Sequence, residues 1–167
     1  MVTRRQILIG TAGVAAAAAG GAALLRGNSS PATAAPEGQF EVTKTPEEWR
    51  KMLTPQQYAV LREHDTEGRW TSPLNQEKRK GTFACVGCDL PLFESKTKFE
   101  SGTGWPSFYA PIDGNIGTKK DFSWGMSRTE VHCRRCGGHL GHVFNDGPKP
   151  TGLRYCINGV SLKFIPA

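Results

Sequence analysis

The chain has 167 residues and a formal net charge of +6, from 21 Lys and Arg against 15 Asp and Glu. Arg4, Arg5 and Arg26 lie within residues 1–36 and all acidic residues come after position 36, which leaves residues 37–167 with 18 basic against 15 acidic residues, a charge of +3. That charge is too small to indicate a nucleic-acid-binding surface, and about 130 residues can bury a hydrophobic core without disulfides.

Residues 1–36 differ from the rest of the chain, because they contain neither acidic nor aromatic residues. Arg4 and Arg5 precede an apolar run rich in Gly, Ala and Leu that ends near Leu25, and Ala-Thr-Ala follows at 32–34. This layout is typical of a secretory signal with an Ala-x-Ala cleavage site. The adjacent arginines resemble those of a twin-arginine signal.

The alternative for this segment is an uncleaved membrane anchor over residues 7–25, which is long enough to span a bilayer. Ala and Gly make the run only weakly apolar, which favours the signal. We therefore expect residues 1–36 to be a signal peptide and linker. Residues 37–167 are expected to form the working domain, exported to the periplasm or another extracytoplasmic compartment, with no membrane contact beyond the export signal.

Two segments near the start of this domain carry the same helix-start signal. Thr45 and Thr54 are each followed by proline and, three residues after the threonine, by Glu or Gln, which matches the capping box. We predict short packing helices at about 46–52 and 55–63. His64 follows the second helix, where we expect an exposed histidine that compensates the helix dipole.

From Gly81 onward the pattern changes to short apolar segments separated by Gly, Pro, Asn and Asp, which is typical of strands and turns. The candidate strands are 82–86, 91–93, 107–109, 122–132, 140–144 and 152–164. Because no long helical pattern appears, we predict a mainly antiparallel β domain with the helices at its N-terminal side.

Four of the five cysteines form two Cys-x-x-Cys pairs, Cys85 with Cys88 and Cys133 with Cys136. Each pair can turn both sulfurs toward one point, and two pairs supply the four thiolates of a closed structural zinc site. Iron in a rubredoxin-like site and a pair of disulfides are the alternatives. The pairs are much farther apart than the roughly 15–20 residues of a zinc ribbon. We therefore predict one structural zinc ion that joins two distant parts of the domain.

The fifth cysteine, Cys156, lies in an extended segment near the C-terminus. Strand alternation places Arg154, Cys156 and Asn158 on one face, and Gly159 is expected to mark a bulge that redirects the strand. A small buried hydrophobe is the simplest role for a cysteine. A guanidinium beside the thiol would instead stabilise the nucleophilic thiolate, and we predict a reactive cysteine.

Two histidines, His139 and His142, follow the second cysteine pair directly. The four cysteines already complete a zinc shell, so we predict acid–base chemistry beside Cys156 for these histidines. A structural role for at least one of them is the alternative. His132, next to Cys133, is either an alternative ligand or an exposed residue, and we assign it no role.

Trp105 lies between glycine and proline in a turn. A rigid aromatic wall with an exposed edge suits the binding of an apolar group such as a methyl. Ordinary partial burial is an equally good reading of this residue taken alone.

Four segments, "CVGCDLPLF", "SGTGWPSF", "HCRRCGGHLGHVFNDGP" and "PTGLRYCINGVSLKF", together resemble the B-type methionine-R-sulfoxide reductases over about residues 45–165. The resemblance implies a mainly β fold of two antiparallel sheets in a barrel-like core, stapled by zinc, with short N-terminal helices. It implies an enzyme that reduces methionine-R-sulfoxide, mainly in oxidised proteins, to methionine.

The same resemblance assigns roles to individual residues. Cys156 matches the nucleophile, which attacks the sulfoxide sulfur and becomes a sulfenic acid. His139 or His142 would supply protons to the sulfoxide oxygen. Trp105 would hold the S-methyl group and select the R epimer. The pocket would also be lined by Phe144, Arg154 and Asn158, and the zinc ligands would be Cys85, Cys88, Cys133 and Cys136.

Thr103 departs from the pattern, because many family members carry a resolving cysteine at this position. Without it, we expect an external thiol or a thioredoxin-like donor to clear the sulfenic acid. The missing thiol also favours a competing interpretation, a zinc-stapled β module that binds without turnover. A nucleic-acid zinc ribbon is disfavoured by the small charge and by aromatic residues that are not interleaved with basic ones.

Overall fold

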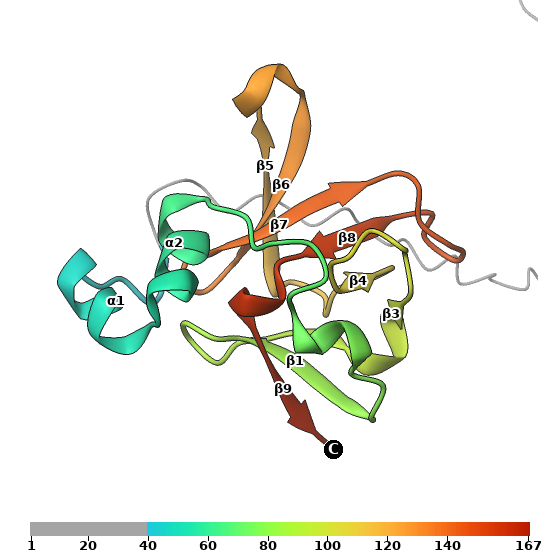
Figure 1. The fold of residues 1–167 in the computed structure, drawn as a ribbon, viewed down its shortest axis with the longest axis horizontal. Coiled ribbons are helices and arrows are strands. Elements are labelled where there is room, and N and C mark those ends of the chain that lie inside the picture. Colours follow the sequence, from blue (N-terminus) through green and yellow to red (C-terminus); the bar gives the residue numbers. More distant parts are fainter. Residues whose placement is uncertain (1–39) are drawn as a thin grey trace, which may run out of the picture.

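The computed structural model describes residues 40–167 (Figure 1), and the signal peptide and linker predicted over residues 1–36 lie outside them. Helices α1 (Pro46–Met52) and α2 (Pro55–Glu63) come first, as predicted. In each, the threonine before the helix and the Glu or Gln three residues later satisfy each other's backbone N–H groups. Within residues 40–167, every helix is too short or too polar to cross a bilayer.

The strands of the described residues form two sheets in which all neighbours are antiparallel, which confirms the predicted fold class. The smaller sheet has the order β2 (Pro91–Glu94), β1 (Gly81–Cys85) and β9 (Leu162–Pro166). The larger sheet has the order β3 (Lys98–Phe99), β4 (Ser107–Phe108), β8 (Arg154–Ile157), β7 (His139–Phe144), β6 (Arg128–Cys133) and β5 (Ile116–Asp121). Four short 3-10 turns connect the helices and strands of the described residues: η1 (Pro73–Gln76), η2 (Ser95–Thr97), η3 (Ser123–Gly125) and η4 (Gly159–Ser161).

The strand predicted over 122–132 is wrong in its first half. Asp121 accepts a hydrogen bond from the backbone N–H of Ser123 at 2.8 Å, and the chain turns at η3 before it returns as β6. Sequence reasoning missed the partner strand β5, whose composition (IGTKKD) is mostly polar. The result is a β5–β6 hairpin that projects from the body of the molecule (Figure 1).

The strand predicted over 152–164 is two strands that belong to different sheets. β8 pairs in the larger sheet and β9 in the smaller one, with the turn η4 between them. Gly159 therefore starts a 3-10 turn and not the predicted bulge. The carboxylate of Glu67 accepts the backbone N–H groups of Gly159 and Val160, which explains why the strand stops here.

An aromatic cluster joins the two sheets. Phe83 and Phe93 of the smaller sheet pack on Phe108 of the larger one, with ring centroids 5.0 Å and 4.3 Å apart, and all three are fully buried. Burial of one such side chain stabilises the fold by about 1.5–3 kcal/mol. Because Phe108 is the register neighbour of Tyr155, this core also positions β8 and its cysteine.

Candidate active site

Cys156 lies in the middle of the larger sheet, between two strands. Its register partner on β7 is His142 and its partner on β4 is Ser107. The neighbouring Gly141 has φ 153°, and a Cβ there would fall well inside van der Waals contact with the carbonyl oxygen of Cys156. Glycine is therefore required for β7 to approach β8 this closely.

A pocket of about 120 Å³ opens over Cys156. It is far smaller than the roughly 300–1,000 Å³ of a site for a drug-sized ligand, so it suits a single side chain. Its lining residues are Thr66, Trp105, Arg128, Gly141, His142, Phe144, Cys156 and Asn158. Five of these were predicted from the sequence. Thr66 and Arg128 were missed because each comes from a segment with no recognisable chemical motif, and Gly141 was missed because a glycine between the two predicted histidines carries no side-chain chemistry of its own.

His142 is the histidine that reaches the pocket. Its Nε2 lies 2.7 Å from a carboxylate oxygen of Asp121 on β5. Hydrogen bonds from Ser123 and from His142 hold the pKa of Asp121 well below its usual range, so the carboxylate accepts and Nε2 carries the hydrogen. Burial lowers the pKa of His142, although Asp121 opposes this effect. The ring is therefore oriented by one nitrogen and is left with the other for proton exchange.

His139 is not among the pocket-lining residues. It is buried, and its Nδ1 lies 2.8 Å from a carboxylate oxygen of buried Glu130. The exposed His64 and Lys119 also approach this carboxylate, at 3.2 Å and 3.3 Å. Burial would raise the pKa of Glu130, but the hydrogen bonds from His139 and His64 outweigh it and hold the pKa well below its usual range. The His139 ring is 5.5 Å from that of His142, so its predicted proton-transfer role would act through His142 or water.

His64 is exposed, as predicted, and it also has a structural role at the end of α2. It caps the helix in the left-handed conformation, with φ 58°, and its ring lies 5.0 Å from that of His139. His132 is buried and is not part of the cysteine cluster, so neither role considered for it from the sequence holds.

Arg154 lies beside Cys156 but is already paired. Its guanidinium donates two hydrogen bonds to Asp146, at 2.9 Å and 2.8 Å, and stacks 4.5 Å over the Phe144 ring. Burial raises the pKa of the Cys156 thiol, and the opposing effects of Thr103 and Arg154 are too weak to reverse this. The prediction that Arg154 keeps Cys156 ionised is therefore wrong for the substrate-free protein.

Asn158 and Trp105 are both held by the segment that follows α2. The Asn158 side chain accepts from the backbone N–H of Glu67 at 3.1 Å and donates to the carbonyl of Leu140 at 3.1 Å. The Trp105 indole N–H donates to the carbonyl of Glu67 at 3.0 Å, and the Arg69 guanidinium lies 5.1 Å from its ring. Both side chains border the pocket in fixed orientations. Sequence reasoning missed Glu67, because nothing in the sequence around it indicates that its carboxylate is buried.

A short row of hydroxyl groups runs from Cys156 into the protein. The Thr103 Oγ1 is 3.8 Å from the Cys156 sulfur. The Ser101 hydroxyl lies 2.8 Å from that of Thr103 and 2.7 Å from that of Ser107. The Thr103 hydroxyl therefore lies beside the Cys156 sulfur, at the position where the family resemblance led us to expect a second thiol in many relatives.

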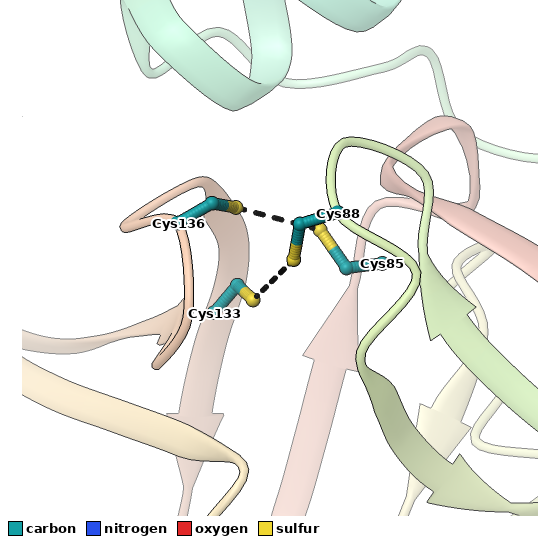
Figure 2. Close-up of side chains that lie close together, drawn as sticks. All are labelled: Cys85, Cys88, Cys133 and Cys136. Carbon is teal, nitrogen blue, oxygen red and sulfur yellow. Dashed lines mark hydrogen bonds between the residues drawn. The ribbon is translucent and has the colours of Figure 1, made fainter. Parts of the chain in front are cut away.

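The two Cys-x-x-Cys pairs converge, as Figure 2 shows. All four sulfurs lie within 4.8 Å of one another, with 3.7 Å between Cys85 and Cys136 and 3.4 Å between Cys88 and Cys133. A tetrahedron with zinc–sulfur bonds of about 2.3 Å has sulfurs about 3.8 Å apart, so the four residues fit such an ion. All five cysteines are free, against the disulfide alternative.

The cluster connects the two sheets. Cys85 ends β1 of the smaller sheet and Cys133 ends β6 of the larger one. The four cysteines are thus positioned to hold a metal ion that staples distant parts of the domain, as the spacing predicted.

Comparison with known proteins gives consistent matches. The profile of the SelR domain matches residues 53–166. The peptide methionine sulfoxide reductase MsrB of Leptospira interrogans is 59% identical over 126 residues, which cover 75% of this chain and 96% of the relative. The proteins of the same name from Pseudomonas putida (strain W619) and Methanosarcina barkeri are 61% and 57% identical over 127 residues, which cover 75% of this chain and 96% and 89% of those relatives.

Proposed function

Since this chain belongs to the SelR-domain family of peptide methionine sulfoxide reductases, we propose the roles by which its own residues carry out the reaction. The enzyme reduces methionine-R-sulfoxide to methionine at the expense of thiols. The observation that carries the residue assignment is the position of Cys156 in a pocket bordered by Trp105 and His142.

Cys156 is the nucleophile. Its sulfur forms a bond to the sulfoxide sulfur, and the substrate's sulfur–oxygen bond breaks. The oxygen then becomes bonded to the Cys156 sulfur as the bond between the two sulfurs breaks, so that methionine leaves and Cys156 keeps the oxygen and one proton as a sulfenic acid. The raised pKa of Cys156 means that the resting thiol still carries the proton that the product needs. His142, oriented by Asp121, accepts this proton from Cys156 on its other ring nitrogen and passes it to the sulfoxide oxygen as the sulfur–oxygen bond breaks.

Trp105 and its supports select the substrate. The indole is fixed by the Glu67 carbonyl and by the Arg69 guanidinium, which suits a rigid wall for the S-methyl group. Phe144 provides a second apolar wall, and the stacked, ion-paired Arg154 keeps this ring in place. A methyl held on one side of the pocket leaves only the R epimer with its oxygen toward His142.

An external thiol clears the sulfenic acid. Four cysteines belong to the metal cluster, and Thr103 offers no thiol beside Cys156. A thioredoxin-like dithiol would form a mixed disulfide with release of water, and its second thiol would then restore Cys156. Mass spectrometry after one turnover without donor should find the sulfenic acid of Cys156 or its adduct. A stable internal disulfide of Cys156 would refute this proposal.

The catalytic assignment has a direct test against the non-catalytic binding module. Reduction of dabsylated methionine-R-sulfoxide with dithiothreitol is expected for the wild-type protein and not for Cys156→Ser. Metal content should be unchanged in the variant, since Cys156 is not part of the cluster. Binding of the sulfoxide by the wild-type protein without turnover would favour the module.

Zinc is the proposed occupant of the four-cysteine site, because four thiolates in a tetrahedron suit a closed structural zinc site. We further propose that residues 1–36 direct export by a twin-arginine-like route, which carries folded cargo and so allows the metal to be loaded before the protein meets an oxidising compartment. N-terminal sequencing of the exported form is expected to begin near Ala35 or Pro36. Retention of the apolar segment in a membrane fraction would favour the anchor.

A further inference from the structure

The pocket over Cys156 accommodates one side chain, so the rest of a peptide substrate has to lie on the protein surface around its mouth. The described residues include five exposed large hydrophobic side chains: Met52, Trp70, Phe122, Met126 and Ile165. Single exposed hydrophobic residues are ordinary. Three of these five, however, lie next to residues that form or orient the pocket.

Trp70 lies beside the turn that carries Trp105. Its backbone N–H donates to the carbonyl of Gly104 at 2.8 Å, and its ring lies so close to Gly104 that a Cβ there would be 3.0 Å away. Trp70 is 59% exposed and has a left-handed backbone with φ 65°. This conformation is uncommon for a bulky residue and is kept where surrounding structure maintains it. Here it holds a large, largely exposed indole beside Gly104, in the turn that carries Trp105.

Phe122 and Met126 occupy the end of the projecting β5–β6 hairpin (Figure 1). Their side chains are 71% and 53% exposed. Asp121, which precedes Phe122, orients His142. Arg128, two residues after Met126, lines the pocket. The hairpin therefore carries two exposed apolar side chains within two residues of positions that line or orient the pocket, and it comes from a different part of the chain than Trp70.

We propose that Trp70, Phe122 and Met126 form a docking surface for the polypeptide on either side of the oxidised methionine, and that this surface favours apolar neighbours in the substrate. The proposal rests on the proposed function, because it takes the pocket as the site of the sulfoxide. Continuity with the pocket identifies the occupant, since a peptide whose side chain reaches Cys156 has to pass over its mouth. Methionine is commonly buried among apolar residues, so unfolded oxidised segments have the required chemistry.

The test compares three substrates under dithiothreitol: free methionine-R-sulfoxide, a short peptide with this residue between leucines, and the same peptide with serines in place of the leucines. We expect the wild-type kcat/KM to be highest for the leucine peptide. In the double variant Phe122→Ser/Met126→Ser, the ratio of kcat/KM for the leucine peptide to kcat/KM for the free amino acid should fall by about five- to tenfold. A decrease of this size corresponds to the loss of part of one buried aromatic contact. Trp70→Asn, which tolerates the left-handed backbone, should act in the same direction.

Ile165→Ser is the matched control, because Ile165 is also exposed but lies on β9 of the smaller sheet. It should leave the substrate preference unchanged. An unchanged preference in the hairpin and Trp70 variants would overturn the proposal. So would a defect that appears with a thioredoxin-like donor but not with dithiothreitol, since the surface would then serve the reductant.

Binding of the leucine peptide to Cys156→Ser, measured by fluorescence anisotropy, separates the proposal from the proposed function. If binding weakens with the hairpin substitutions while the wild-type protein shows no turnover, the docking surface stands and the catalytic assignment fails. If turnover is normal and the hairpin substitutions leave the affinity for the leucine peptide unchanged, the docking surface is wrong but the catalytic assignment stands.

Discussion

The pKa of the Cys156 thiol depends on the relative size of two opposing effects. Burial destabilises the thiolate, whereas the Thr103 hydroxyl and the Arg154 guanidinium stabilise it. Arg154 is bound to Asp146 by two hydrogen bonds, so much of its charge is already compensated. Burial therefore prevails, and the pKa lies above the ordinary value of 9.0.

The alkylation of Cys156 should accordingly be slow at neutral pH and should still increase above pH 9.0, the ordinary thiol value. Arg154→Met removes a stabilising cation and should shift the profile to still higher pH. Labelling of the metal-loaded protein by iodoacetamide, followed by mass spectrometry, measures both profiles. A rate that has already reached its plateau at neutral pH would contradict the assignment.

Thr103→Cys should allow the sulfenic acid of Cys156 to be cleared by an internal disulfide in place of an external thiol. The Thr103 oxygen is 3.8 Å from the Cys156 sulfur, so a local shift of about 2 Å would bring two sulfurs to bonding distance. The adjacent Gly102 has no atoms near the position of a Cβ, which leaves the turn room to move. After one turnover without donor, the variant should contain an internal disulfide. Persistence of the sulfenic acid, as in the wild-type protein, would show that the turn is too rigid.

Glu130→Gln should destabilise the protein by about 3 kcal/mol at neutral pH, because it removes a buried carboxylate that contacts His139, His64 and Lys119. The folded state holds the pKa of Glu130 below its ordinary value of 4.5. Its ionisation therefore stabilises the fold above that pH, and this contribution is lost as the pH falls toward the lower folded pKa. Urea unfolding over a pH series should show the difference between variant and wild type narrowing in acid.

Glu63→Gln is the matched control for Glu130, since Glu63 forms an exposed ion pair with Arg50 at 3.9 Å. It should change the unfolding free energy by less than about 1 kcal/mol at any pH. A comparable loss in both variants would mean that the Glu130 network contributes no more than a surface charge.

At the scale of elements, the spacing of β7 and β8 depends on Gly141. Gly141→Ala would press a methyl group against the carbonyl of Cys156 and should destabilise the protein by about 3 kcal/mol or more. Gly102→Ala is the control, because Gly102 also has a positive φ but open space around it. It should cost about 1–2 kcal/mol. Thermal unfolding of both variants separates backbone strain from the clash, and equal costs would contradict the steric argument.

Elements were predictable from the sequence where local chemistry decides them. The capping boxes at Thr45 and Thr54 satisfy backbone groups within three residues, and both helices begin where these threonines predict. β5 was missed because its stability comes from pairing with β6 and not from its polar sequence. The long C-terminal strand was overextended because the carboxylate that interrupts it, Glu67, is remote in sequence.

The same distinction holds for the candidate site. Cys156, the two cysteine pairs and the Trp105 turn were recognisable from residue type and spacing. Asp121 and Asp146 were not, because an acidic residue near a turn has many ordinary roles and only the folded chain brings each to its partner, His142 or Arg154. For the same reason the burial of Cys156, which reverses the expected direction of its pKa, could not be weighed in advance.

At the scale of the whole molecule, two features bring the sheets together: the aromatic cluster around Phe108 and the convergence of the four cysteines, which would hold the sheets through a bound ion. The cysteines lie at the ends of β1 and β6 and bring together residues that are about 50 positions apart. An ion that binds only the folded chain adds its binding free energy to stability. Removal of this ion should therefore loosen the contact between the two sheets and also the two turns that carry the cysteine pairs.

Metal analysis should find one zinc ion per chain, and a strong chelator should lower the unfolding temperature substantially. Hydrogen exchange should then accelerate first in the β1–β2 hairpin and the turn at residues 133–138. Cys88→Ser should reproduce this effect, whereas Cys156→Ser should retain the ion and the wild-type unfolding temperature. If the ion were absent, or if its removal left the unfolding temperature unchanged, the proposed contribution of the four cysteines to stability would be wrong, and the buried core shared by the two sheets would account for their association.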